Sequence, residues 1–161
     1  MKKLVLFLFL GMALLQDVCA QLPKLQLKSI DGKVVNVNKI PDGENLTIIS
    51  FFATWCHPCI RELSAIHELY PDWQDETGVR LVAVSIDNSV NSLKVKPLVR
   101  SKGWDYEVLL DENGALKRAM NVELIPSVFI VDGKGEIIWR HAGYVDGGEQ
   151  EIYRELIKAI R

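Results

Sequence analysis

The stretch TIISFFATWCHPC, residues 47–59, combines a strand, a turn and a pair of cysteines. Its first seven residues, 47–53, are mostly β-branched or aromatic, which predicts a strand buried on both faces, as in a parallel sheet. Apolar side chains recur at helical spacing after the cysteines, and we expect that helix to end at Pro71. A second apolar strand follows over residues 79–86. Strand, helix and strand in succession predict a βαβ unit and hence an α/β protein.

Weaker patterns flank this unit on both sides. Apolar and polar residues alternate over 24–38 around Asp31-Gly32, which predicts an N-terminal β-hairpin. Beyond residue 86 the patterns predict a partly helical segment at 88–104, a strand at 106–110, a short helix at 115–120, a hairpin of strands 127–131 and 136–140, and a final amphipathic helix after Gly147-Gly148. No repeat or interdomain linker interrupts them, so we expect a single domain.

Cys56 and Cys59 carry the chemistry that this sequence predicts. Three residues apart in the first turn of a helix, they lie on one face, at a separation that a disulfide can span. Unpaired N–H groups and the positive end of the helix dipole favour a thiolate at Cys56, and we expect Cys59 to be more buried. Pro58 suits the first turn, because its missing N–H has no intrahelical partner there. We therefore expect Cys56 to attack a disulfide and Cys59 to resolve the mixed disulfide.

Other uses of a Cys-x-x-Cys motif fit this sequence less well. A structural zinc site needs four ligands, and no second cysteine pair is present to join the three histidines, His57, His67 and His141. Haem attachment needs His directly after the second cysteine, where the chain has Ile60. A purely structural disulfide across so small a loop would remove little chain entropy. The pattern therefore indicates redox chemistry that needs neither a cofactor nor a metal.

The first 20 residues have the pattern of an export signal. Two lysines precede an apolar run over residues 4–15, and Val18-Cys19-Ala20 fits a signal-peptidase site. We expect cleavage before Gln21, which leaves residues 21–161 as the mature domain in the periplasm or another extracytoplasmic space. Two alternatives are an uncleaved membrane anchor, for which the apolar run is short, and lipidation at Cys19, for which the preceding residues are a poor match.

Composition and charge exclude one class of partner. The chain is 48% hydrophobic and 25% charged, as in ordinary globular proteins. Its net charge is −2, and the loss of residues 1–20 would remove two lysines and one aspartate. A mildly acidic protein without a basic run does not attract a phosphate backbone, so we expect no nucleic-acid partner.

Residues 51–59, FFATWCHPC, resemble the active-site stretch of thioredoxins. The hairpin at Asp31-Gly32-Lys33 and the long stretch from Ile86 to Pro126 resemble the TlpA/ResA branch of exported thioredoxin-like reductases. The resemblance covers nearly the whole mature chain. It implies a thioredoxin-like α/β fold, in which helices flank a mixed central sheet. It also implies an N-terminal β-hairpin and an insertion between the βαβ unit and the strand that follows a cis-proline.

The resemblance extends to residues outside the cysteine pair. Pro126 matches the cis-proline of the fold, although most X-Pro bonds are trans, and Ile125 would offer its backbone to an extended substrate. Glu62 matches an acidic residue of ResA-type proteins and would help to move the proton of Cys59. Many thioredoxins instead carry a buried Asp in the preceding strand, where this chain has Ser50. For Glu62, a solvated carboxylate on the helix surface is the alternative.

Trp55 and His57 flank the attacking cysteine. We expect Trp55 to shield the disulfide and to contact partners. A protonated His57 would stabilise the Cys56 thiolate and make the protein more oxidising, whereas the resemblance implies a reductase. Between these opposing indications we favour the reductase.

The predicted function is that of an extracytoplasmic thiol-disulfide oxidoreductase that reduces protein disulfides; members of the resembled branch often reduce apocytochrome c cysteines. Its partners would be proteins with cysteines or disulfides, and a membrane or periplasmic thiol donor. The alternatives are a peroxiredoxin-like thiol peroxidase and a non-catalytic thioredoxin-fold binding module. Peroxiredoxins need Thr three residues before the reactive cysteine, where this chain has Ala53, and Thr54 lies one position too close.

Overall fold

The computed structural model describes residues 20–161, so the predicted export signal lies outside the described residues except for Ala20. Its seven strands form one mixed sheet in the order β2-β1-β5-β4-β3-β6-β7. In chain order the elements are β1 (Gln26–Ser29), β2 (Val34–Asn36), η1 (Val37–Lys39), β3 (Thr47–Phe52), α1 (His57–Thr77), β4 (Arg80–Ser85), η2 (Ser92–Lys94), α2 (Val95–Lys102), β5 (Glu107–Leu110), α3 (Ala115–Ala119), β6 (Ser127–Val131), β7 (Ile137–Ala142) and α4 (Glu149–Ala159).

Strand β3 lies inside the sheet, parallel to β4 and antiparallel to β6. Every one of its residues is buried, which confirms the prediction of a strand covered on both faces. Side chains alternate across a strand, so Ile48 and Phe52 belong to one core cluster while Ile49 and Phe51 belong to the other. The sequence is apolar on both faces because neither face meets water.

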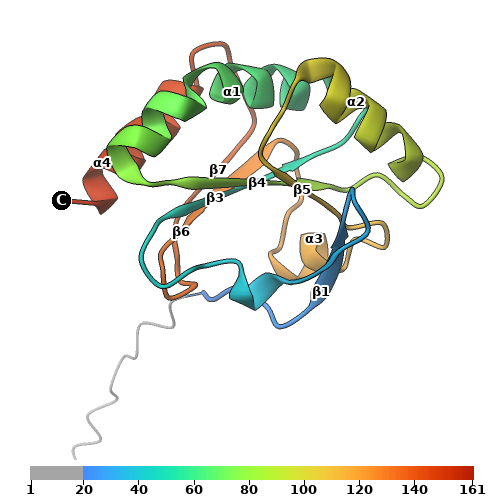
Figure 1. Ribbon diagram of the computed structural model, residues 1–161, viewed down its shortest axis with the longest axis horizontal. Helices are drawn as coiled ribbons and strands as arrows, with labels where there is room; N and C mark the ends of the chain where they lie inside the picture. Colours follow the sequence, from blue (N-terminus) through green and yellow to red (C-terminus); the bar gives the residue numbers. More distant parts are fainter. Residues whose placement is uncertain (1–19) are drawn as a thin grey trace, which may run out of the picture.

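Two layers cover the sheet. Helices α1, α2 and α4 lie on one face, and α3 lies on the other with the N-terminal segment (Figure 1). The predicted hairpin is present as β1 and β2, which pair antiparallel, and the stretch between β4 and β6 contains η2, α2, β5 and α3. None of the helices in residues 20–161 is both long and apolar enough to cross a membrane. The α/β architecture with a mixed central sheet is confirmed.

Helix α1 is longer than the sequence predicts. The sequence pattern predicts an end at Pro71, but the helix continues to Thr77. The ring of Pro71 faces solvent, while Tyr70 and Trp73 on either side of it are buried in the core. The hydroxyl of Tyr70 also accepts a hydrogen bond of 2.9 Å from the backbone N–H of Leu81 in β4. Packing of these two aromatic side chains therefore outweighs the hydrogen bond that proline removes from a helix.

Candidate active site

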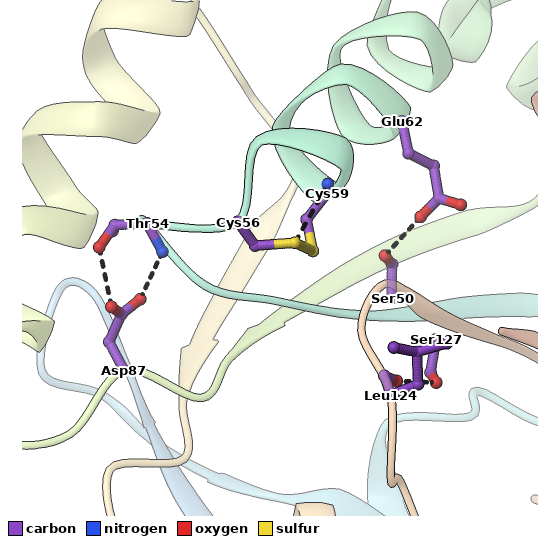
Figure 2. Close-up of a disulfide and its surroundings, with 8 residues drawn as sticks. All are labelled: Ser50, Thr54, Cys56, Cys59, Glu62, Asp87, Leu124 and Ser127. Carbon is purple, nitrogen blue, oxygen red and sulfur yellow. Dashed lines mark hydrogen bonds between the residues drawn. A yellow bond between two sulfur atoms is a disulfide. The ribbon is translucent and has the colours of Figure 1, made fainter. Parts of the chain in front are cut away.

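Cys56 and Cys59 form a disulfide, with 2.00 Å between the sulfurs and 5.3 Å between the Cα atoms. Cys56 is the N-cap of α1, at the end of the turn that leaves β3. Its Sγ accepts a hydrogen bond of 3.3 Å from the backbone N–H of Cys59 (Figure 2). One of the free donors at the helix start therefore already points at the Cys56 sulfur, as the position of the motif predicts.

The two sulfurs differ in their access to solvent. Cys59 is fully buried, whereas Cys56 retains 7% of its surface. Trp55, next to it, is 62% exposed, and both His57 and Pro58 are exposed as well. A large reagent such as a protein can therefore reach Cys56 but not Cys59.

A groove of about 440 Å³ opens beside the disulfide. The groove is lined by both segments that match thioredoxins, because Ile125 lines it together with Trp55 and Cys56. The Ile125–Pro126 peptide bond is cis, as the resemblance implies. Pro126 itself is buried, and its carbonyl accepts a hydrogen bond of 2.8 Å from the N–H of Gly143. The remaining lining residues are His57, Pro58, Ile86, Lys117, Glu123 and Leu124.

Glu62 lies on the inner face of α1 and points towards the sheet (Figure 2). It is only 2% exposed, so the alternative of a solvated surface carboxylate is wrong. The hydroxyl of Ser50 in β3 donates a hydrogen bond of 3.3 Å to its Oε2. Burial raises the pKa of Glu62 to about 8; the hydrogen bond from Ser50 opposes the rise, and the carboxylate of Glu149 adds to it. Ser50 occupies the strand position at which many thioredoxins have a buried acid. In this chain Ser50 instead donates a hydrogen bond to the acid Glu62.

A buried carboxylate that the sequence patterns do not single out, that of Asp87, lies beside the site. It follows β4 and is 1% exposed. Asp87 accepts hydrogen bonds of 2.8 Å from both the backbone N–H and the hydroxyl of Thr54, two residues before Cys56 (Figure 2). A signal was present in the sequence, since a polar residue directly after a buried strand lies at the edge of the sheet where functional residues gather.

The other candidate ligands in the chain lie apart from the disulfide. Nδ1 of His67 is 3.5 Å from Asp105, and Nδ1 of His141 is 4.0 Å from Glu151. Within residues 20–161, no group of three or more His, Cys, Asp or Glu side chains is arranged to hold a metal ion.

Comparison with known proteins agrees with this geometry. The AhpC/TSA family model matches residues 18–140. The thiol-disulfide oxidoreductase ResA of Bacillus thuringiensis is 29% identical over 134 residues, 83% of this chain and 69% of that protein. The sporulation thiol-disulfide oxidoreductase A of Bacillus subtilis is 31% identical over 112 residues, 69% of this chain and 66% of that protein.

Among solved structures, a thioredoxin-like protein from Porphyromonas gingivalis is 60% identical with a TM-score of 0.76, covering 85% of this chain and 90% of that one. The predicted thioredoxin-like fold is thereby confirmed. The Cys56–Cys59 disulfide of this chain lies at the start of α1, as expected of a redox-active pair. The chain belongs to the AhpC/TSA family and is a thiol-disulfide oxidoreductase of the thioredoxin superfamily.

Proposed function

We propose that the chain reduces disulfides of proteins outside the cytoplasm, with Cys56 as the attacking thiol and Cys59 as the resolving thiol. The observation that carries the proposal is the unequal exposure of the pair: Cys56 opens to the groove, and Cys59 is fully buried. A sulfur of the substrate can therefore meet only Cys56. Cys59 stays behind it, within reach of the mixed disulfide that forms.

The cycle begins with both cysteines reduced. The Cys56 thiolate attacks one sulfur of the substrate disulfide, a new S–S bond forms, and the other substrate sulfur leaves as a thiolate. Cys59 then loses its proton and attacks the Cys56 sulfur. The internal disulfide closes, and the second substrate sulfur is released and takes up a proton. Two electrons have passed to the substrate, so a thiol donor must return two electrons to the Cys56–Cys59 disulfide.

We propose that Glu62 exchanges a proton with the Cys59 thiol. It lies one helical turn beyond Cys59 on the same side of α1. With a pKa of about 8, its carboxyl group has nearly the proton affinity of a thiol, about 8.5, so a proton can pass between them at little cost. The Ser50 hydroxyl fixes the orientation of the carboxyl group.

The surroundings of the groove favour extended substrates and a reducing role. Trp55 and Leu124, exposed by 62% and 58%, flank it with apolar surface, and the backbone at Ile125 would pair with a substrate strand. His57 points to solvent and is not buried against the Cys56 sulfur, whereas Cys59 is fully buried, and burial disfavours its thiolate. A less stable thiolate makes a stronger reductant. Oxidised apocytochrome c segments are one substrate class that suits such a groove.

Reduction of insulin by dithiothreitol tests the proposal. The reduced wild-type protein should accelerate the reaction, and both Cys56→Ser and Cys59→Ser should abolish the acceleration. Only Cys59→Ser should accumulate a mixed disulfide with the substrate, visible by mass spectrometry. A wild-type rate equal to that of dithiothreitol alone would support a non-catalytic binding module, and a trapped adduct in Cys56→Ser would reverse the two roles.

Export is the second part of the proposal. When residues 1–161 are expressed together, the mature protein should begin at Gln21 and appear in the extracytoplasmic fraction. The measurement is an intact mass with N-terminal sequencing. A mass that retains residues 1–20 in the membrane fraction would support the anchor instead.

A further inference from the structure

Asp87 lies beside the active-site turn because of the sheet register. Strands β3 and β4 are parallel neighbours, with Phe52 opposite Ser85, so their carboxyl ends lie side by side. The N–H of Ile86 continues the pairing with a hydrogen bond of 2.9 Å to the carbonyl of Phe52. The next residue, Asp87, therefore meets Thr54, which is the first turn residue before Trp55 and Cys56.

The contacts between Asp87 and Thr54 form a two-point clamp. The Thr54 hydroxyl donates to Oδ1 and the Thr54 backbone N–H donates to Oδ2, each at 2.8 Å. The Ser85 hydroxyl also donates to Oδ2 at 2.8 Å. The clamped residue belongs to the tight turn that presents Cys56, since the Cys56 N–H bonds to the carbonyl of Ala53 at 3.0 Å. The position of the Cys56 sulfur thus depends on a carboxylate that follows the neighbouring strand.

The charge of this clamp is not neutralised by a cation. Asp87 takes part in none of the ion pairs found within residues 20–161, and its partners are one N–H and two hydroxyl groups, which suit an acceptor-only carboxylate. A buried charge in such a setting is screened less than a surface charge. It opposes the formation of a second negative charge on the nearby Cys56.

We propose that Asp87 is a positioning residue for Cys56: through Thr54 it fixes the turn that presents the attacking sulfur, and its charge makes the thiolate less favourable. As a consequence, the Cys56–Cys59 dithiol is a stronger reductant. The inference rests on Cys56 being the attacking thiol, as proposed above. The other ionisable groups of this region are His57, Lys117 and Glu123, which line the groove with Cys56, and Glu62, which points from α1 towards Ser50.

The substitution Asp87→Asn removes the negative charge of Asp87 but can keep its hydrogen bonds to Thr54 and Ser85. The amide oxygen can accept from the Thr54 N–H and the Ser85 hydroxyl, and the amide nitrogen can donate to the Thr54 oxygen, so the geometry survives without the charge. The midpoint pH for alkylation of Cys56 by iodoacetamide should fall by about half a unit or more. Above that midpoint, the equilibrium with glutathione should move towards the dithiol by the same factor, about threefold.

Asp111→Asn is the matched control. Asp111 is also a fully buried carboxylate, but it accepts from the N–H groups of Leu116 and Lys117 at the start of α3. It should leave the alkylation midpoint and the glutathione equilibrium unchanged. If Asp87→Asn leaves both quantities unchanged while it lowers the stability of the oxidised and reduced forms equally, Asp87 is only structural and the proposal is overturned.

If Asp87→Asn does not fold, variants of Thr54 test whether Asp87 positions Cys56. Thr54→Val keeps the side-chain shape and the Asp87 charge but removes one contact of the clamp, so insulin reduction should slow several-fold with no fall in the alkylation midpoint. Thr54→Ser restores the hydroxyl and should restore the rate. Equal rates for Val, Ser and wild type would overturn the proposal. Failure of the proposed function looks different, because Cys56 in the wild-type dithiol would then react no faster than Cys59.

Discussion

At the scale of single residues, Glu62 shows how strongly folding changes the chemistry of a side chain. In the sequence it is an acid on a helix, and two roles were open to it. In the structure its carboxyl group lies between α1 and β3, with Ser50 as its hydrogen-bond partner. The loss of water around it raises its pKa from 4.5 to about 8. The proposed role of Glu62 in proton transfer therefore depends on burial, which residue type alone does not reveal.

The raised pKa predicts how the stability of the oxidised protein depends on pH. Between about pH 4.5 and 8 the folded state keeps a proton on Glu62 that the unfolded state has lost. The contribution of this group is therefore complete below pH 4.5 and is lost as the pH rises towards 8, by at most about 1.4 kcal/mol per pH unit. Glu62→Gln removes this dependence. Urea unfolding at pH 5, 6, 7 and 8 should show the wild type losing stability relative to the variant.

The control is Glu68→Gln, which removes an exposed carboxylate from the same helix. Its stability should follow the wild type at every pH. Parallel curves for wild type and Glu62→Gln would mean that Glu62 is ionised in the folded protein at neutral pH, and its assignment to the proton of Cys59 would lose its support.

At the scale of elements, α1 contains a proline, Pro71, that destabilises the helix. Pro71 removes one backbone hydrogen bond, and its ring faces solvent. Pro71→Ala restores the donor without touching the core. The free energy of unfolding should rise by about 1 to 3 kcal/mol, measured by urea denaturation of the oxidised protein. No increase would mean that the helix has already adjusted its backbone around the ring.

The end of α1 gives a second prediction at this scale. Gly78 caps the helix with φ of 69°, and a Cβ there would lie 2.6 Å from Oδ1 of Asn45. Gly103 caps α2 with φ of 68°, but a Cβ there would have open space around it. Gly103→Ala should cost about 1 to 2 kcal/mol for the backbone conformation alone. Gly78→Ala should cost more, because it also displaces Asn45, and chemical denaturation of the two variants measures the difference. Equal losses would show that Asn45 moves aside freely.

At the scale of the whole molecule, the arrangement of the turn separates disulfide exchange from peroxide chemistry. The family to which the chain belongs shares one fold, so the fold does not choose between these activities. Thr54 lies two residues before Cys56, and its hydroxyl is already donated to Asp87. It is therefore not free to bind a peroxide beside the Cys56 sulfur.

We accordingly expect the reduced protein to consume hydrogen peroxide no faster than an ordinary exposed thiol does. Under the same conditions it should accelerate insulin reduction. Peroxide loss followed by a colorimetric assay, with Cys56→Ser as the blank, measures the first quantity. Peroxide consumption faster than disulfide exchange would instead support the alternative that the protein is a thiol peroxidase.

The sequence by itself determined the fold class and the reactive pair. The apolar run at residues 47–53, the helical spacing after it and the second strand required a βαβ unit, because these patterns depend on neighbours close in the chain. The same holds for Cys56 and Cys59, whose geometry follows from three residues of spacing at a helix start. The resemblance to thioredoxins added the cis bond before Pro126.

Only the tertiary structure decided the surroundings of that pair. Glu62 is buried because β3 packs under α1, and Asp87 reaches Thr54 because β4 lies parallel to β3, 33 residues apart in the chain. Helix α1 passes Pro71 because Tyr70 and Trp73 find a core to fill. Each of these outcomes is set by contacts between segments distant in sequence, and local spacing carries no information about which distant groups will meet.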